Sequence, residues 1–300
     1  MDVRSQKLRT FFASFIAGHR DKRIEAAFAA VPREPFAGPG PWSLMSNAFV
    51  YVAAPDDDPA FLYQDALLAL DAERGINIGM PSAHAMWLDA AGVKEGDAVL
   101  QVGAGTGYYS AILAELVGPN GRVEAYEIDT GLAACATENL RDRPQVKVHA
   151  LSGIADQLPK VDLVYVCAGI TQPSRSWLNA LRPGGRLVFP LQPEQASGGM
   201  LMITRPNSGP HWPARFLMRA QFIGCQGPQD EDASRRLREA FAGRWDQVRS
   251  FRVDPVDDET CWFAGDGWWL STQDAPGTPA WKWLTASSSL RVHNSSTTFL

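Results

Sequence analysis

The sequence predicts an α/β fold, a doubly wound parallel sheet with helices on both faces. Two observations predict it. From residue 98 to residue 191, short apolar runs typical of buried parallel strands alternate with segments of helical period. The connections between them are short, which is typical of a sheet whose crossovers are helices lying on its two faces. A helical and loop segment precedes this alternation, and a small α+β C-terminal subdomain is expected after it.

The central elements follow one another regularly along the chain. Strands are expected at 98–102, 122–127, 146–150, 161–167 and 186–191. Helices are expected at 82–91, 108–117, 130–140 and 173–181. The segment Pro183-Gly184-Gly185 marks a turn before the last of these strands.

The flanking regions have a different character. Before the alternation we expect two helices within 5–31, a Pro/Gly-rich loop at 32–42, a strand at 48–53 and a helix at 61–72. After it we expect strands at 200–204 and 215–223, a helix at 231–242 and a polar, frayed tail at 285–300. The chain is therefore predicted to have three parts: 1–80 with helices and substrate-side loops, a core at 81–205, and a C-terminal extension at 206–300.

The stretch AVLQVGAGTGYYSAILAELV at 98–117 carries most of the functional information. A buried strand leads into Gly103, Gly105 and Gly107, and a helix follows at once. Glycines at this turn let the backbone bend sharply and approach a ligand with no Cβ in the way. Glu127 comes 20 residues after Gly107, at the end of the next strand. In a doubly wound sheet, this is where a carboxylate meets the two hydroxyls of a ribose.

The spacing of the glycines distinguishes two cofactors. A dinucleotide fingerprint G-x-G-x-x-G requires glycine or alanine at position 108, whereas this chain has Tyr108 there and a glycine at 107. The form G-x-G-x-G resembles the first motif of the class I methyltransferases that use S-adenosylmethionine. An ordinary tight turn between strand and helix is the simpler interpretation of the triplet alone. With the strand before it and the spaced acid after it, the motif predicts S-adenosylmethionine rather than NAD, and a Rossmann-like methyltransferase sheet.

Composition argues against several kinds of partner. The net charge is -5 and no stretch is dense in lysine and arginine, so we expect no nucleic acid partner. The four cysteines are widely scattered, and no His/Cys cluster has metal-ligand spacing, so we expect no metal.

The N-terminal segment LRTFFASFIAG at 8–18 has its apolar residues at helical spacing, with polar residues between them. We interpret it as an amphipathic helix that packs on the domain rather than a secretion signal. No apolar run approaches the length of a membrane span. The sequence therefore predicts no membrane partner and a cytoplasmic location.

Several segments between about residues 24 and 193 together form a recognisable pattern. They are AFAAVPREPF, Tyr63-Gln64-Asp65, GINIGMPSAHA, VLQVGAGTGYYSAILAELVG, VEAYEI, VDLVYVCAG and LRPGGRLVFP. With these segments the chain resembles the protein-L-isoaspartate (D-aspartate) O-methyltransferase family. The glycine loop and the PGG turn are shared by most class I methyltransferases, but the VPRE-x-F segment and the block before the core are particular to this family.

The resemblance implies where acceptor chemistry takes place. In the family the block before the core reads approximately T-I-S-x-P-x-x-x-A, and its serine is the residue usually assigned to catalysis. Here Gly79 stands where that serine is expected. The acceptor site is therefore expected at Gly79 with Asn77 and Ser82 beside it, where a side chain or a backbone N–H can replace the lost hydrogen bond. Asp65 either faces the substrate, as the family's pattern suggests for its counterpart, or caps the helix that follows it.

The resemblance and the glycine loop together imply a cofactor-binding set. Two of its positions depart from the family pattern: the acid usually found before the first glycine is Gln101, and the usual G-D-G segment appears as Leu151-Ser152-Gly153. The expected set is Ile78, His84, Gln101, Gly103, Ala104, Gly105, Gly107, Tyr108, Glu127, Ile128, Ser152, Gly153 and Ala168.

Three functions are compatible with these residues. The first is carboxyl O-methylation of aspartyl or isoaspartyl groups in peptides or proteins, which needs no general base because a carboxylate of pKa about 4 is already ionised. The second is a methyltransferase of the same ancestry with another acceptor, a modified peptide or a small metabolite, which Gly79 and the C-terminal extension favour. The third is a module that binds the cofactor without turnover, because a fold alone does not establish activity.

Tryptophans gather near the end of the chain and have two interpretations. They either form a wall for a peptide or aromatic substrate, or bury large areas in the C-terminal subdomain, as aromatic residues usually do. We favour the second. The residues concerned are Trp262, Trp268, Trp269, Trp281 and Trp283.

Overall fold

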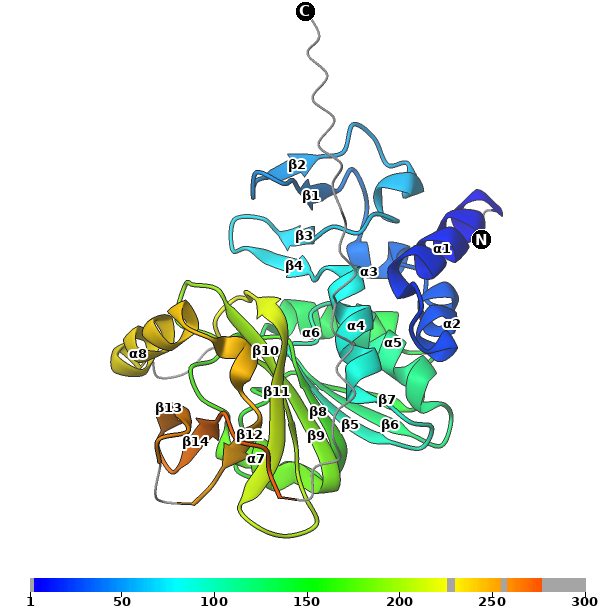
Figure 1. Ribbon diagram of the computed structural model, residues 1–300. Helices are drawn as coiled ribbons and strands as arrows, with labels where there is room; N and C mark the ends of the chain where they lie inside the picture. Colours follow the sequence, from blue (N-terminus) through cyan, green and yellow to red (C-terminus); the bar gives the residue numbers. More distant parts are fainter. Residues whose placement is uncertain (1–2, 226–229, 255–257, 277–300) are drawn as a thin grey trace, which may run out of the picture.

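The computed structural model describes residues 3–225, 230–254 and 258–276. Its centre is a ten-stranded sheet in the order β13-β14-β12-β11-β10-β9-β8-β5-β6-β7 (Figure 1). The parallel part consists of β5 (Ala98–Val102), β6 (Arg122–Tyr126), β7 (Val146–His149), β8 (Val161–Val166) and β9 (Leu181–Leu191). The strand order reverses between β5 and β8, and in such sheets ligands bind in the crevice at the carboxyl ends of the strands beside this point.

The strands of the C-terminal extension continue the same sheet. They pair antiparallel, beginning with β10 on β9. They are β10 (Gly198–Thr204), β11 (His211–Ala220), β12 (Ser250–Arg252), β13 (Cys261–Gly265) and β14 (Trp268–Ser271). The division at residue 206 therefore falls within one continuous sheet, and the three-part organisation stays a prediction.

Helices cover both faces of the sheet, which confirms the predicted fold class. Alternate residues along each central strand enter two separate apolar clusters, as the two-residue period of a strand requires. One cluster contains side chains from α1 (Val3–Ala17), α2 (Lys22–Ala30), α4 (Pro81–Ala91), α5 (Tyr108–Val117) and α6 (Thr130–Asn139). The other contains side chains from α7 (Arg175–Ala180) and α8 (Glu231–Ala242).

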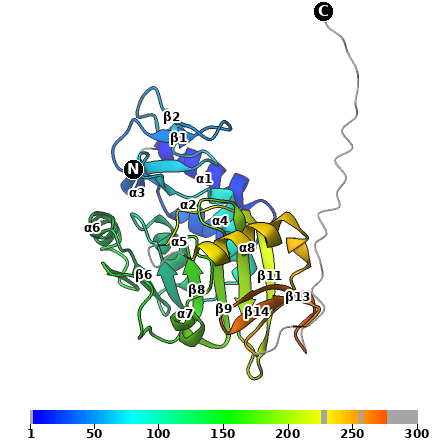
Figure 2. The ribbon, with the colours of Figure 1, turned by 90° about the vertical axis from the view of Figure 1, so that its left-hand side faces the viewer.

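A second, four-stranded antiparallel sheet lies beyond one end of the core strands (Figures 1 and 2). Its order is β2-β1-β3-β4, and it is preceded by the short helix α3 (Glu34–Ala37). The strands are β1 (Ser43–Met45), β2 (Tyr51–Ala53), β3 (Leu68–Asp71) and β4 (Ile76–Ile78). The last of them leads directly into Gly79 and helix α4, so this sheet lies over the crevice of the core.

The helix predicted at 61–72 is wrong. The structure has a single 3-10 turn at Pro59–Phe61 and then strand β3, whose Leu68 pairs with both Leu44 and Ile78. A short apolar run fits a helix and a buried strand equally well by periodicity. This segment forms a strand because it pairs with β1, which comes earlier in the sequence, and with β4, which comes later.

Other boundaries shift by a few residues. Strand β2 covers only the second half of the expected strand at 48–53, β9 begins five residues before 186, and β11 lies earlier than the expected 215–223. The expected tail at 285–300, with Trp281 and Trp283, lies outside the described residues. Trp268 and Trp269 are buried in β14, where Trp268 stacks on Phe251, which supports their interpretation as core residues.

Candidate functional site

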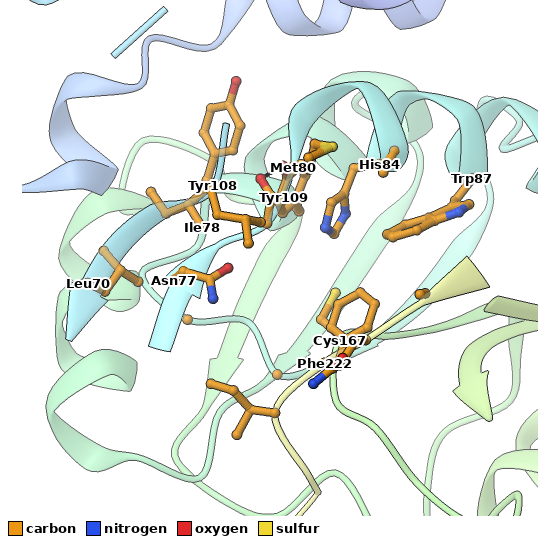
Figure 3. A pocket seen from close by; sticks show the side chains of 18 of the residues that line it. Leu70, Asn77, Ile78, Met80, His84, Trp87, Tyr108, Tyr109, Cys167 and Phe222 are labelled. Carbon is orange, nitrogen blue, oxygen red and sulfur yellow. Dashed lines mark hydrogen bonds between the residues drawn. The ribbon is translucent and has the colours of Figure 1, made fainter. Parts of the chain in front are cut away.

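A cavity of about 610 Å³ opens where the strand order reverses. Its walls are the four-stranded sheet, the start of α4, the glycine loop after β5, Cys167 after β8, and the segment 218–223, which comprises the end of β11 and the residues that follow it (Figure 3). Segments far apart in the sequence therefore enclose one space. The glycine loop and the block Asn77–His84, which were predicted to hold cofactor and acceptor, both face it.

The three glycines of the loop all have left-handed backbone conformations, with φ of 77° at Gly103, 58° at Gly105 and 95° at Gly107. Gly107 and Gly105 have different roles. A Cβ on Gly107 would lie 2.7 Å from Cδ1 of Leu140, so this glycine permits close packing against the end of α6. A Cβ on Gly105 would meet only Cδ1 of Leu70, at 3.8 Å, which is an ordinary van der Waals contact. The cavity surface at Gly105 is therefore bare backbone.

Glu127 lies behind this loop, directly after β6, with only 7% of its surface exposed. Its Oε2 accepts a hydrogen bond from the Gly105 N–H at 2.8 Å, and its Oε1 accepts one from the Asp129 N–H at 3.0 Å. Each carboxylate oxygen can accept a second bond. Glu127 therefore ties the glycine loop to the end of β6 and still has capacity for two ligand hydroxyls. Ile128 beside it is 44% exposed, as a surface for a flat ring requires.

The side chain of His84 explains why residue 79 is glycine. Gly79 does not have a left-handed φ. A Cβ built on it would overlap Nε2 of His84 and would lie 3.0 Å from Cδ2 of the same ring. Real Cβ atoms essentially never lie closer than 3.0 Å to such atoms. Glycine is therefore required at 79 because the imidazole of His84 fills the side-chain space of that residue.

His84 itself is firmly held, with 1% of its surface exposed. Its ring stacks on Tyr109 with centroids 3.5 Å apart and planes at 7°, and its Nδ1 forms a 2.8 Å hydrogen bond with the Tyr165 hydroxyl. The Tyr109 hydroxyl donates to the carbonyl oxygen of Gly79 at 2.7 Å. Burial lowers the pKa of His84 from 6.5 to about 3, so the imidazole is neutral.

Of the other predicted acceptor residues, only Asn77 faces the cavity, with its amide donating to the Gly75 carbonyl at 2.9 Å. The Asp65 carboxylate accepts from the Ser82 backbone N–H at 2.9 Å, in the first turn of α4. Neither Asp65 nor Ser82 is among the cavity-lining residues. Asp65 thus caps α4 from a distant part of the chain, and it holds the helix that carries His84.

Several predicted cofactor residues lie apart from the cavity. Gln101 is buried within β5, where its side-chain Oε1 accepts a hydrogen bond from the Ser110 hydroxyl at 2.7 Å. Gly153 packs against the side chain of Val102, where a Cβ would approach to 2.7 Å, and its carbonyl accepts from the Trp177 indole at 2.8 Å. Gln101 and Gly153 are not among the residues that line the cavity, and neither are Gly107, Glu127, Ile128, Ser152 and Ala168. The first-motif residues Ala104 and Tyr108 and the preceding Ile78 do line it.

One wall of the cavity was not predicted from the sequence. The backbone of Phe222 is held by the side chain of Gln192, which donates to its carbonyl at 2.9 Å and accepts from its N–H at 2.8 Å. The Gly169 N–H donates to the Ile223 carbonyl at 2.8 Å. This segment brings the ring centroid of Phe222 to 5.7 Å from that of Trp87 and 6.4 Å from that of His84. Nothing in the local sequence indicates it, since the contacts join residues 30 or more positions apart.

Two findings concern partners of other kinds. Within residues 3–225, 230–254 and 258–276, no group of three or more His, Cys, Asp and Glu side chains is placed to hold a metal ion. In the same ranges no helix is long and apolar enough to span a membrane.

The fold and the site together define the class of protein. A Rossmann-like sheet, a bare glycine loop at the reversal of strand order and a buried acid after the next strand are the features of a class I methyltransferase. The chain belongs to the protein-L-isoaspartate(D-aspartate) O-methyltransferase family, whose model matches residues 16–225.

Individual relatives agree with this family. A protein-L-isoaspartate O-methyltransferase of Ignicoccus hospitalis is 32% identical over 210 residues, which are 68% of this chain and 90% of that protein. One from Methanopyrus kandleri is 34% identical over 177 residues, 57% of this chain and 70% of that protein.

Solved structures of proteins described as members of this family share the fold. One has a TM-score of 0.59 at 21% identity and covers 82% of this chain and 71% of that chain. Another, from Plasmodium falciparum in complex with S-adenosyl-L-homocysteine, has a TM-score of 0.56 at 16% identity and covers 74% of this chain and 98% of that chain.

Proposed function

We propose that this protein is an S-adenosylmethionine-dependent O-methyltransferase that methylates the carboxyl group of aspartyl or isoaspartyl residues in peptides or proteins. The observation that carries the proposal is the single cavity joining the bare glycine loop to the Gly79–His84 block. Membership of the family supports the reaction type, because relatives bear that name.

Gly105, which lines the cavity, and two residues behind the glycine loop that do not line it, Glu127 and Ile128, fit the proposed cofactor. Gly105 leaves room beside the loop, Glu127 keeps two lone pairs for the ribose hydroxyls, and Ile128 provides an exposed apolar surface for the base. When bound, S-adenosylmethionine supplies an electrophilic methyl group whose bond pair remains on sulfur as the acceptor oxygen forms the new bond. Gln101, Ser152, Gly153 and Ala168, which the resemblance assigns to the cofactor, lie outside the cavity, and their cofactor role stays a prediction.

The charge of the cavity supports a carboxylate acceptor. Among the described residues that line it, none is acidic, and Arg219 carries the one formal charge. An anionic acceptor therefore meets no like charge, whereas a cationic amine finds no carboxylate to pair with. The protein has only to orient an oxygen that is already ionised at neutral pH, and orientation alone can contribute roughly 7–11 kcal/mol to such a reaction.

The other two hypotheses have weaker support. Another acceptor was favoured by the missing serine and the C-terminal extension, whereas a cofactor-binding module without turnover rested only on the argument that a fold does not establish activity. The missing serine has a local explanation in the position of His84, and the extension continues the core sheet. A cytoplasmic location and the three-part domain division stay predictions.

Mass spectrometry of an isoaspartyl peptide incubated with the protein and S-adenosylmethionine tests the proposal. We expect the peptide to gain one methyl group on the isoaspartyl carboxyl. A matched peptide with isoasparagine at the same position, which lacks the free carboxyl, is the control. No transfer to isoaspartyl or aspartyl peptides by a folded protein that binds the cofactor would contradict the proposal.

A further inference from the structure

We propose that His84 is a catalytic residue: its neutral imidazole donates a hydrogen bond from Nε2–H to the acceptor carboxylate and so holds the attacking oxygen in place. This assignment rests on the proposed function. It concerns a ring that lines the cavity and whose Nε2 fills the side-chain space of Gly79 (Figure 3).

The position of Nε2 is the first step. This atom occupies the volume that a Cβ at residue 79 would take, so it lies in the side-chain space of that residue. Gly79 and Asn77 on one side and Phe222 on the other enclose the same space. An imidazole at 84 and a hydroxyl at 79 are therefore alternatives that cannot coexist in this geometry.

The tautomer is the second step. The Tyr165 hydroxyl is fully buried, and burial raises its pKa well above the ordinary value, so it keeps its proton. Its one hydrogen-bond partner among the described residues is Nδ1 of His84, at 2.8 Å. Since a buried hydroxyl proton needs an acceptor, Tyr165 donates and Nδ1 accepts. A neutral imidazole then carries its proton on Nε2.

The unfilled hydrogen bond is the third step. Among the described residues no acceptor is paired with Nε2–H, and the Tyr109 hydroxyl, the nearest polar group on the stacked ring, donates instead to the Gly79 carbonyl. The walls next to it, Trp87 and Phe222, are aromatic. A carboxylate oxygen entering here gains a charge-assisted bond from a donor that is already oriented.

A set of four proteins tests the assignment through turnover of an isoaspartyl peptide. We expect His84→Ala to lower kcat/KM about 10- to 100-fold, the effect of one hydrogen bond to a charged group. Gly79→Ser should also lower it, because serine collides with the ring. The double variant Gly79→Ser/His84→Ala has room for the hydroxyl and should recover at least about tenfold over His84→Ala. His211→Ala, at a paired histidine on β11 away from the cavity, is the control and should match the wild type.

Activity near the wild-type level in His84→Ala, a gain from Gly79→Ser alone, or a double variant no better than His84→Ala would each overturn the assignment. Thermal unfolding identifies variants that have lost the fold, and calorimetric cofactor affinity separates a loss of cofactor binding from a loss of the acceptor contact.

Nuclear magnetic resonance of histidine-labelled wild-type protein decides the question without turnover. We expect the His84 resonances to show the Nε2–H tautomer at neutral pH. With S-adenosylhomocysteine present, the isoaspartyl peptide should shift the Nε2–H signal, and the isoasparagine peptide should not. An Nδ1–H tautomer, or no shift on binding the isoaspartyl peptide, overturns the role of His84. If the protein binds the cofactor but does not methylate the peptide, the proposed function is overturned instead. The spectra then still show which tautomer His84 has and whether its Nε2–H contacts the peptide carboxylate.

Discussion

The buried, neutral state of His84 predicts a pH dependence of folding stability that a single substitution should remove. In the folded protein the pKa of His84 is about 3, and in the unfolded chain the imidazole has its ordinary value of 6.5. The unfolded state therefore binds more protons between these two values. Stability is unaffected above pH 6.5 and falls as the pH falls below it, because protonation then favours the unfolded chain.

The size of the effect follows from the two pKa values. At about pH 5 the unfolded imidazole is almost fully protonated and the folded one is not, which lowers the free energy of unfolding by about 2 kcal/mol relative to about pH 7.5. The groups that face the ring from α5 and β8 are Tyr109 and Tyr165, and their pKa values are raised by burial. Both stay neutral throughout this range and do not obscure the signal.

Urea unfolding of the wild type and of His84→Gln at about pH 5 and about pH 7.5 measures the prediction. Glutamine does not titrate, so the variant should lose about 2 kcal/mol less than the wild type between the two pH values, whatever its stability at pH 7.5. The other four histidines of the chain are shared by both proteins and cancel in the comparison. An equal loss in the two proteins would refute the claim that His84 is buried and neutral.

Four further predictions concern the cofactor loop, the helix cap and the unpredicted wall. Glu127→Ala should weaken S-adenosylmethionine binding at least about tenfold by calorimetry, and unchanged affinity in a folded variant would remove Glu127 from the site. Gly105→Val should abolish cofactor binding, because the valine side chain enters the space of the cofactor. Gly209→Val is the control for backbone strain, since Gly209 also has a left-handed conformation but has open space around it. Equal cofactor affinities of the two variants would contradict the assignment of the loop. Asp65→Ala should lower stability by about 1 kcal/mol in denaturant unfolding, as loss of a helix cap does, and no change would show that the bond to Ser82 is dispensable. Gln192→Ala should raise KM for the peptide with cofactor affinity unchanged, and a parallel loss of cofactor affinity would mean that Phe222 does not belong to the acceptor side alone.

The core of the fold could be predicted because its signals are local. Strand β5, the glycine loop and helix α5 are contiguous, and their apolar periodicity and glycine spacing are set within about 20 residues. Strand β3 could not be predicted in the same way. Leu67 to Leu70 is an apolar run with no distinguishing period, and its state depends on pairing with β1 and β4.

The site divides along the same line. The sequence predicts Gly103, Gly105 and Glu127 as site residues because a ribose and a close backbone approach require particular residues at particular spacings. It does not predict Gln192, Phe222 and Tyr165, because they act through contacts between distant segments. Asp65 was recognised as either a substrate contact or a cap, and the distance to the Ser82 N–H supports the cap.

Gly79 illustrates how a residue that looks like a loss in the sequence becomes a requirement in the structure. From the sequence alone, glycine at this position either lacks a useful hydroxyl, makes room for a larger acceptor, or adopts a left-handed conformation. The φ of Gly79 excludes the last explanation. The overlap of its missing Cβ with His84 Nε2 supplies one that the sequence did not indicate: the room is taken by a side chain of the protein itself. Because that side chain is stacked on Tyr109 and bonded to Tyr165, restoring serine at 79 without removing the imidazole should impair the site, and residues 79 and 84 must be changed together to exchange one donor for the other.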